Sequence, residues 1–290
     1  MLGAILGDIA GSVYEFVNNR VVPQELFTSK CFATDDTYLT CAVADALYKW
    51  KQGADLKTEV LVETLWAYKN YPRAGWGAGF SSWANKMLAK LNLYTYNGKK
   101  IKFFANKSAG NGAAMKVAAI PYYAESLEEC IELTKIVTSV THDHEDSYTA
   151  AECLTTSMYM ALRGKTRDQI RQNIFKYYPE ARYMNYATLR VEYKYTELAK
   201  DTVPQAMVCF LESDSFEDAL RKAISIGGDA DTLGAITGAL AEAFYKWPEN
   251  KYKEYRNLVD DYGLYEVPYK SLYRFEKIAK QKLPKLYQGK

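Results

Sequence analysis

Two short clusters of carboxylate and hydroxyl side chains lie far apart in the sequence. One is Thr34-Asp35-Asp36-Thr37 and the other is Gly228-Asp229-Ala230-Asp231-Thr232. Oxygen ligands of this kind are those that hard divalent cations such as Mg²⁺ prefer. Four carboxylates brought together without cations would repel one another. We therefore expect the two clusters to meet around two divalent ions, with open positions left for substrate oxygens.

Each cluster stands at the start of a predicted helix, with Asp229 at an N-cap position in the second. The simpler interpretation of either cluster alone is a capped helix with ordinary first-turn acids. The occurrence of two such clusters favours the metal interpretation. Apolar residues follow each cluster at helical spacing: Leu39, Val43 and Leu47 after the first, and Leu233, Ile236, Leu240, Phe244 and Trp247 after the second.

The beginning of the chain, residues 2–16, reads as a helix with glycine every four residues. Gly3, Gly7 and Gly11 would give this helix one smooth face that a neighbour can approach closely. The helix after the second cluster has small residues of its own, namely Ala230, Gly234, Ala235, Gly238 and Ala239. Both helices are therefore expected to pack tightly against neighbours.

A second face of the first helix is polar, because Asp8, Ser12 and Glu15 are spaced to line up on it. We interpret Asp8 as a buried carboxylate that accepts hydrogen bonds. Glu15 stands at the helix end, beside an irregular surface loop at 17–33. A carboxylate on a movable loop is a candidate catalytic or metal-linked group.

Two glycine-containing segments each allow two interpretations. Residues 73–83 interleave three glycines with aromatic residues, which suits either a flexible aromatic wall for a ligand or a turn-rich connector. Residues 108–112, Ser-Ala-Gly-Asn-Gly, precede a predicted helix start and could present backbone N–H groups to phosphate oxygens. The same pattern is also common turn chemistry.

The two histidines of the protein, His142 and His144, stand among acids and a threonine at 141–146. No cysteine or third histidine supports a zinc site there. His142 is expected either to hydrogen-bond a ligand or to close the end of the helix that Ser126 and Glu129 begin.

The composition indicates one domain with a substantial core. The 290 residues are 48% hydrophobic, and 37 Lys plus Arg against 35 Asp plus Glu give no net field that favours nucleic acid. Five scattered cysteines indicate reduced thiols in a cytoplasmic protein. No signal peptide or transmembrane stretch is expected. Further helices are expected at 55–68, 166–177, 203–212, 215–227 and 270–282, so we predict a single all-α domain over residues 1–290.

Taken together, the motifs resemble those of the ADP-ribosylglycohydrolase family, from Met1 to about Pro248. They occur in family order: Gly7-Asp8 to Glu15, Thr34 to Thr37, Gly75-Trp76-Gly77, Ser108 to Met115, Thr141-His142, and Gly228 to Thr232. Val203-Pro204-Gln205-Ala206 and Phe216-Glu217-Asp218-Ala219 are similar to further family signatures.

The resemblance implies a compact orthogonal helical bundle with two Mg²⁺ ions, or Mn²⁺ as a substitute, in a central cleft. It implies hydrolysis of the bond between ribose C1″ of ADP-ribose and an acceptor nitrogen or oxygen. The metal ligands by matched position are Thr34, Asp35, Asp36, Asp229, Asp231 and Thr232. The diphosphate would lie on Ser108, Gly110, Asn111 and Gly112, and His142 would contact the ribose. Glu15 or Asp36 would act as general base or acid.

The sequence departs from the family pattern in the substrate-holding loops. Ala109 replaces an aromatic residue, Lys116 replaces Arg, and residues 142–146 differ from the common His-Asn-His-Pro-Glu. Both metal clusters are intact. The acceptor therefore stays open, whether an ADP-ribosylated protein, a small molecule or a nucleic acid, and ADP-ribose is the expected product. A monomer with no membrane partner is expected. The alternatives are an inactive ADP-ribose or nucleotide binder and a crystallin-like structural protein, which would have no need for four clustered carboxylates.

Overall fold

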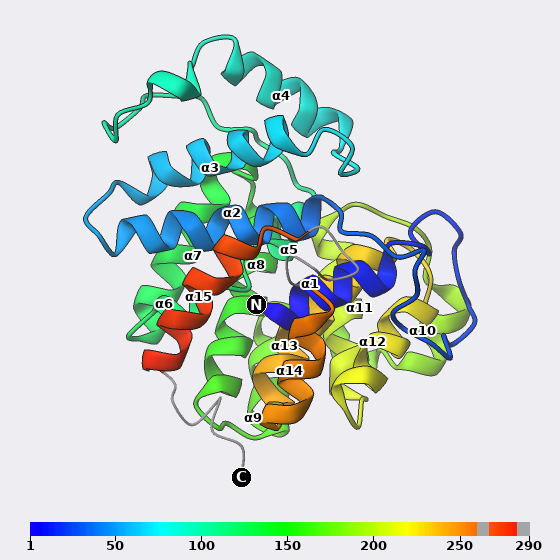
Figure 1. The fold of residues 1–290 in the computed structure, drawn as a ribbon. Coiled ribbons are helices and arrows are strands. Elements are labelled where there is room, and N and C mark those ends of the chain that lie inside the picture. The colour runs from blue at the N-terminus through cyan, green and yellow to red at the C-terminus, as the bar shows by residue number, and fades with distance from the viewer. Residues whose placement is uncertain (260–266, 283–290) are drawn as a thin grey trace.

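The computed structural model describes residues 1–259 and 267–282, and within these ranges the fold is helical, without a β-strand (Figure 1). The prediction of an all-α fold is confirmed. In chain order the helices and 3₁₀ segments are α1 (Leu2–Gly11), α2 (Asp35–Trp50), α3 (Leu56–Asn70), α4 (Ala78–Leu88), η1 (Leu93–Thr95), α5 (Gly112–Met115), α6 (Ile120–Tyr123), α7 (Leu127–Thr141), α8 (Glu145–Leu162), α9 (Arg167–Tyr177), η2 (Pro179–Tyr183), α10 (Tyr186–Glu192), α11 (Ala199–Leu211), α12 (Phe216–Ser225), α13 (Ala230–Tyr245), α14 (Glu249–Asn257) and α15 (Tyr269–Lys282).

The centre of the bundle is the contact between α1 and α13 (Figure 1). Every residue of α1 is buried. The glycine face of α1 meets small residues of α13 so closely that a Cβ atom added at Gly7 would lie 2.0 Å from the Gly234 carbonyl oxygen. The close-packed face predicted from the sequence is therefore confirmed, and its partner is the helix that begins at the second acidic cluster. Buried apolar residues from Met1 to Ala279 form one continuous core.

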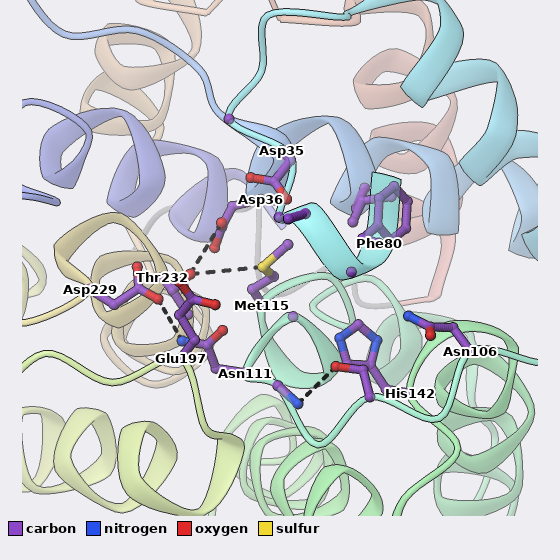
Figure 2. A pocket seen from close by; sticks show the side chains of 18 of the residues that line it. Asp35, Asp36, Phe80, Asn106, Asn111, Met115, His142, Glu197, Asp229 and Thr232 are labelled. Carbon is purple, nitrogen blue, oxygen red and sulfur yellow. Dashed lines mark hydrogen bonds between the residues drawn. The ribbon is translucent and has the colours of Figure 1, made fainter. Parts of the chain in front are cut away.

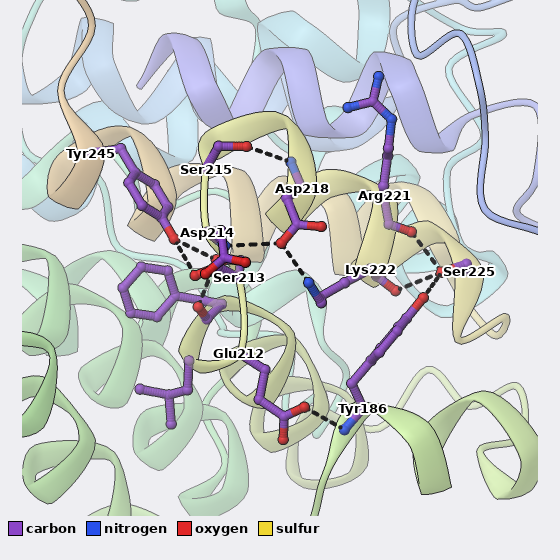
Figure 3. Close-up of polar contacts among 12 residues, drawn as sticks. Tyr186, Glu212, Ser213, Asp214, Ser215, Asp218, Arg221, Lys222, Ser225 and Tyr245 are labelled. Carbon is purple, nitrogen blue, oxygen red and sulfur yellow. Dashed lines mark hydrogen bonds and ion pairs between the residues drawn. The ribbon is translucent and has the colours of Figure 1, made fainter.

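Side-chain caps begin several of the predicted helices where expected. The capping box of Thr166 and Gln169 starts α9, and Asp55 accepts the Thr58 amide at the start of α3. At α12, Ser215 Oγ accepts the Asp218 amide, and Asp218 in turn binds the Asp214 amide (Figure 3). These caps set the direction of α12, which leads the chain into the second acidic cluster.

The first helix is shorter than the sequence predicts, since α1 ends at Gly11 and not at residue 16. The hydroxyl of Ser12 donates to the Ile9 carbonyl at 2.8 Å and accepts the Phe32 amide at 3.1 Å. These bonds turn the chain at Ser12. Glu15 consequently lies in a turn beyond the helix, and the predicted alignment of Asp8, Ser12 and Glu15 on one helical face is wrong.

The acidic segment after His142 is the start of α8, a helix that the sequence analysis missed. His144 is its N-cap, with Nδ1 accepting the Asp146 amide at 3.2 Å. Glu145 and Asp146 are first-turn acids, which complement the positive end of a helix. The side chains of His144, Glu145 and Asp146 are therefore explained by the start of a helix, and Asp143 accepts the Tyr148 hydroxyl at 2.6 Å. Helices α4, α10 and α14 were not predicted either.

All five cysteines are free and buried, in agreement with the expectation of reduced thiols. None of the helices in the described ranges combines the length and the apolarity needed to traverse a lipid bilayer.

Candidate active site

A pocket of about 370 Å³ opens where the N-termini of α2 and α13 face the turn before α5. Figure 2 shows the carboxylates of Asp36, Asp229 and Glu197 on one side of this pocket, and Phe80, Asn106 and His142 on the other. The pocket thus has an acidic half and a half with an aromatic ring and neutral polar groups. Of the predicted site residues, it is lined by Glu15, Asp35, Asp36, Ser108, Gly110, Asn111, Gly112, His142, Asp229 and Thr232.

The acidic half joins three separate segments of the chain. Carboxylate oxygens of Glu15, Asp229 and Asp231 all lie within 4.8 Å of one another. Asp36 is linked to the same group, because Thr232 Oγ1 donates to Asp36 Oδ2 at 3.2 Å. The structure therefore brings together the two acidic clusters and the carboxylate at the end of the N-terminal segment, as the sequence analysis expected.

The carboxyl groups of this cluster have raised pKa values. Burial, together with the charge of Asp229, raises the pKa of Glu15 to about 7. Burial also raises the pKa of Asp36 well above its usual value, with further contributions from Asp8 and Asp35. The pKa of Asp231 is raised in the same way by burial and by Asp229 and Asp36. Carboxyl groups so close together favour the protonated state unless positive charge is supplied.

The donor set fits a divalent cation. Asp36 Oδ1 is buried and has no hydrogen-bond partner within the described structure. None of the ion pairs among the described residues involves the clustered carboxylates, so no lysine or arginine neutralises them. Carboxylate and hydroxyl oxygens at these separations are suitable ligands for Mg²⁺ or Mn²⁺.

The raised pKa values predict how cation binding depends on pH. Without cations, each group binds its proton more tightly in the folded protein than in the unfolded chain, so its contribution to stability is complete below about pH 4. That contribution is lost as the pH rises through the raised pKa of the folded protein, which is about 7 for Glu15. Cations compete with these protons. We expect Mg²⁺ to raise the melting temperature much more at about pH 8 than at about pH 5, where protons occupy the cluster. Equal Mg²⁺-induced shifts in calorimetric scans at the two pH values would contradict the assignment.

Thr34 is a predicted ligand whose hydroxyl is hydrogen-bonded within the protein. Its hydroxyl donates to Asp8 Oδ1 at 2.7 Å, and it does not line the pocket. Asp8 also accepts the Thr34 amide and the Thr37 amide, each at 3.0 Å, and the Thr37 hydroxyl. The interpretation of Asp8 as a buried, hydrogen-bonded carboxylate is confirmed. Asp8 and Thr34 therefore fix the start of α2, which orients Asp35 and Asp36.

Asp229 occupies the N-cap position of α13, but its side chain makes no capping bond. Its Oδ2 instead accepts the Asn111 side-chain amide at 2.7 Å. This bond ties the second acidic cluster to the turn before α5. The Asp229 side chain is thus positioned in the pocket by Asn111 and does not cap α13.

The Ser108–Gly112 turn is anchored to neighbouring segments by its own backbone. The Asn111 amide donates to the Glu197 carbonyl at 2.7 Å, and the Gly110 amide donates to Ser108 Oγ at 3.1 Å. Single antiparallel β-bridges also pair the backbone of Lys107 with that of His142, and the backbone of Gly110 with that of Leu198. Two of the amides predicted to receive a diphosphate therefore have protein partners in this structure, and the phosphate role of the turn stays a prediction.

His142 ends α7, as one of its two predicted roles requires, and it also lines the pocket, where its contact with a ligand stays a prediction. Its Nδ1 lies 2.8 Å from Thr141 Oγ1 and 3.1 Å from the ammonium nitrogen of the buried Lys116. Burial, then the charge of Lys116, lowers the pKa of His142 well below its usual value. On the other edge of the ring, Nε2 would lie only 2.9 Å from a Cβ atom at Gly112. Glycine at that position makes room for a neutral imidazole.

The glycine and aromatic segment at 73–83 buries aromatic rings and also lines the pocket, and its role as a wall for a ligand stays a prediction. Gly75, Gly77 and Phe80 line the pocket, while the Trp76 ring stacks on Phe80 with centroids 5.1 Å apart. The segment is therefore a connector that buries aromatic rings and also forms one pocket wall. Phe80 and Trp83 belong to α4.

Several pocket residues were not predicted, including Asn106, Tyr195 and Glu197. Glu197 reaches the pocket because its carbonyl binds the Asn111 amide. The segment around it has neither a helical nor a strand period, so the sequence carries no signal for it.

Arg20 holds the turn that carries Glu15 against the body of the protein. Its guanidinium donates to the carbonyls of Ile226 and Tyr193 and, at 3.2 Å, to that of Leu189. Arg221 adds a bond to the Pro23 carbonyl at 3.1 Å. These contacts place the loop at 17–33 beside the second acidic cluster, which explains how Glu15 reaches Asp229.

Comparison with known proteins points to one family. A family model described as ADP-ribosylglycohydrolase matches residues 1–264. ADP-ribosylhydrolase ARH3 of Mus musculus is 24% identical and aligns with 84% of this chain and 82% of its own length. ADP-ribosyl-dinitrogen reductase glycohydrolase of Rhodospirillum rubrum is 23% identical, with 84% and 83% covered. A solved structure described as an ADP-ribosylglycohydrolase-related protein complex shares the fold, with a TM-score of 0.63 at 23% identity over 99% of this chain and 96% of that chain.

Proposed function

The chain belongs to the ADP-ribosylglycohydrolase family, and we propose that it is a divalent-cation-dependent hydrolase that releases ADP-ribose from an acceptor by cleaving the N- or O-glycosidic bond at ribose C1″. The observation that carries this proposal is the meeting of Glu15, Asp36, Asp229 and Asp231 at one pocket, where no ion pair among the described residues neutralises them. A protein that only bound a nucleotide, or only formed structure, would retain the repulsion between these groups without any benefit.

We assign the cation ligands to the acidic half of the pocket. They are Asp35, Asp36, Asp229, Asp231 and Thr232. Thr34 stays a further candidate, because its hydroxyl donates its proton to Asp8 and keeps oxygen lone pairs for a cation. When bound, divalent cations would compensate the carboxylate charge and polarise sugar oxygens as Lewis acids. A ribose in this half would therefore present its hydroxyls to the ligand cluster.

Glu15 is the candidate for proton transfer at the scissile bond. In the metal-free protein, burial and the charge of Asp229 raise its pKa to about 7. Bound cations would lower this pKa, so Glu15 would be ionised and able to accept a proton at neutral pH. Asp36 is the alternative base. Because Asp36 is bonded to Thr232 and lies deeper than the half-buried Glu15, we favour Glu15.

The opposite half of the pocket would hold the rest of the ligand. We assign the adenosine diphosphate portion to the side formed by Phe80, His142 and the Ser108–Gly112 turn. A neutral His142 keeps a polar ring nitrogen next to this turn without adding charge.

The proposal predicts complete dependence on divalent cations. Release of ADP-ribose from a panel of arginine-linked, serine-linked, nucleic-acid-linked and small ADP-ribosylated compounds should stop after chelation. It should return when Mg²⁺ or Mn²⁺ is added back in excess of the chelator. Full turnover in the chelated protein would contradict the role given to the acidic cluster. Binding of ADP-ribose without turnover of any member of the panel would favour a binding protein.

A further inference from the structure

The chain that forms one rim of the pocket carries charge of a single sign. Residues 64–124 contain no Asp or Glu, although the whole protein has 37 Lys plus Arg and 35 Asp plus Glu. The net charge of the protein is therefore close to zero although acidic and basic residues are distributed very unevenly along the chain. We call residues 69–107 the basic segment. Its exposed basic side chains are Lys69, Arg73, Lys86, Lys90, Lys99, Lys100, Lys102 and Lys107.

Almost none of these charges is neutralised within the protein. Among the described residues, the single ion pair that involves them joins Lys100 Nζ to Asp55 Oδ1 at 3.3 Å. Two lysines lie over exposed aromatic rings instead, with Lys69 4.2 Å from the Tyr94 centroid and Lys90 5.0 Å from that of Phe104. The Tyr94 side chain is 71% exposed. The surface thus combines cations that mostly lack a carboxylate partner with solvent-exposed aromatic side chains.

A second hollow, of about 590 Å³, lies beside the active-site pocket within this segment. The two hollows share Gly75 in their walls. Lys69 and Arg73 line the second one together with Trp76 and Asn85, and no carboxylate lines it. A ligand in this hollow would therefore meet positive charge, an aromatic ring and an amide next to the reaction site.

The basic segment is also placed for access by a large partner. Helix α4 and the chain after it form the outermost layer beyond α3, at the top of the view in Figure 1. From the same segment, Asn106 and Lys107 reach the rim of the pocket. A polymer lying along the segment would pass the mouth of the active site.

We propose that the basic segment binds single-stranded nucleic acid, and, given the proposed function, that such a strand is the acceptor from which the pocket removes ADP-ribose. Unpaired lysines and arginines replace the counterions of a phosphate backbone, and exposed aromatic rings stack on bases. In the reaction, water adds its hydroxyl to C1″ and its proton to the leaving atom of the strand. The products are free ADP-ribose and an unmodified strand.

The aromatic rings distinguish this partner from an acidic polypeptide. Carboxylate side chains would need only the cations, whereas this surface combines cations with exposed Tyr94 and Phe104 and with a hollow that contains Trp76. Bases offer flat faces to such rings at every nucleotide. The combination of the two features on one face favours nucleic acid.

The test measures how tightly the full-length protein binds a labelled oligothymidylate that carries no ADP-ribose. Binding is measured by fluorescence anisotropy at several salt concentrations. Affinity should fall as salt rises, with a logarithmic slope of about −0.7 for each phosphate contact. Lys69→Gln with Arg73→Gln should remove two contacts, which weakens binding about 25-fold at about 0.1 M salt. The matched control is Lys165→Gln with Arg182→Gln, which removes the same exposed groups elsewhere and should change nothing.

Stacking is tested separately, because Tyr94→Ala should weaken oligothymidylate binding about tenfold and leave an abasic strand of the same length unaffected. Strand binding by Lys69→Gln with Arg73→Gln that equals the parent's would overturn the proposal. So would equal affinity for oligothymidylate, the abasic strand and polyglutamate, which would indicate an acidic polypeptide. Turnover of a small ADP-ribosylated compound reports the proposed function independently. Turnover of that compound without any strand binding would therefore overturn this inference alone.

Discussion

The Asp231→Asn variant is expected to lose cation binding and turnover together. Asp231 is buried and lies within 4.8 Å of both Glu15 and Asp229, so an amide there removes a charged ligand from the centre of the cluster. Loss of groups that only support metal ligands commonly costs 10- to 100-fold in affinity or activity. We therefore expect at least about a hundredfold loss of turnover, and no Mg²⁺-induced rise in melting temperature.

Glu15→Gln should behave differently, because Glu15 stands on a turn at the pocket entrance. Removal of a general acid or base usually costs about 10²- to 10⁴-fold in rate. Turnover should fall by that order, while ADP-ribose affinity, measured by calorimetry, stays within a few fold of the parent. A parallel loss of ADP-ribose affinity in Glu15→Gln would mean that Glu15 holds the site together and does not transfer a proton.

The melting temperature of the metal-free variant distinguishes loss of a cation ligand from misfolding. In the metal-free protein, burial and neighbouring charges raise the pKa of Asp231, so the neutral Asn resembles the state that the fold prefers. Metal-free Asp231→Asn should consequently melt at or above the temperature of the metal-free parent near neutral pH. An inactive variant that is also strongly destabilised would leave the ligand assignment without support.

The parts of the site that the sequence predicted are those in which the functional groups sit at helix starts. Asp35, Asp36, Asp229 and Asp231 are recognisable because a helical period follows each pair at once. Local spacing therefore fixes where these carboxylates stand. It does not determine their partners. The sequence assigned Thr34 to a metal, whereas the structure binds its hydroxyl to Asp8, a residue distant in the chain.

The missed features depend on contacts that no local pattern encodes. Helix α8 escaped because its N-cap is His144, and the acids after it were considered as ligands. Glu197 lines the pocket because its carbonyl receives the Asn111 amide across the fold. The charge of the basic segment could be counted in the sequence, but its position at the pocket rim became visible only with the fold.

Among substitutions that add a single methyl group, we expect Gly7→Ala to cause the largest loss of stability in this protein. A Cβ atom there would lie 2.0 Å from the Gly234 carbonyl oxygen and 2.8 Å from the Ala235 amide nitrogen. Both are backbone atoms, so no side-chain rotation can relieve the overlap. Overpacking a core usually costs about 1–3 kcal/mol, and a backbone clash belongs at or above the upper end. We expect a loss of about 3 kcal/mol or more, measured by urea denaturation.

The control for this prediction is Gly79→Ala. Gly79 lies in the first turn of α4, and no atom beyond its chain neighbours and the nearby backbone of its own helix lies within 4 Å of a Cβ added there. In an open helix the same substitution stabilises by up to about 1 kcal/mol, because alanine has the higher helix propensity. The two variants should therefore change stability in opposite directions. Equal effects would mean that α1 and α13 can separate without cost.

Separation of α1 from α13 should also disable the site. Helix α1 carries Asp8 and leads to Glu15, whereas Asp229 and Asp231 stand at the start of α13. Their spacing depends on how closely the two helices approach, and Gly11 meets Ala230 at that very end, where a Cβ atom would lie 2.2 Å from the carbonyl oxygen. Any Gly7→Ala protein that still folds should thus bind Mg²⁺ more weakly than the parent. Parental Mg²⁺ affinity in such a protein would show that the cluster is positioned by the loops and not by this helix contact.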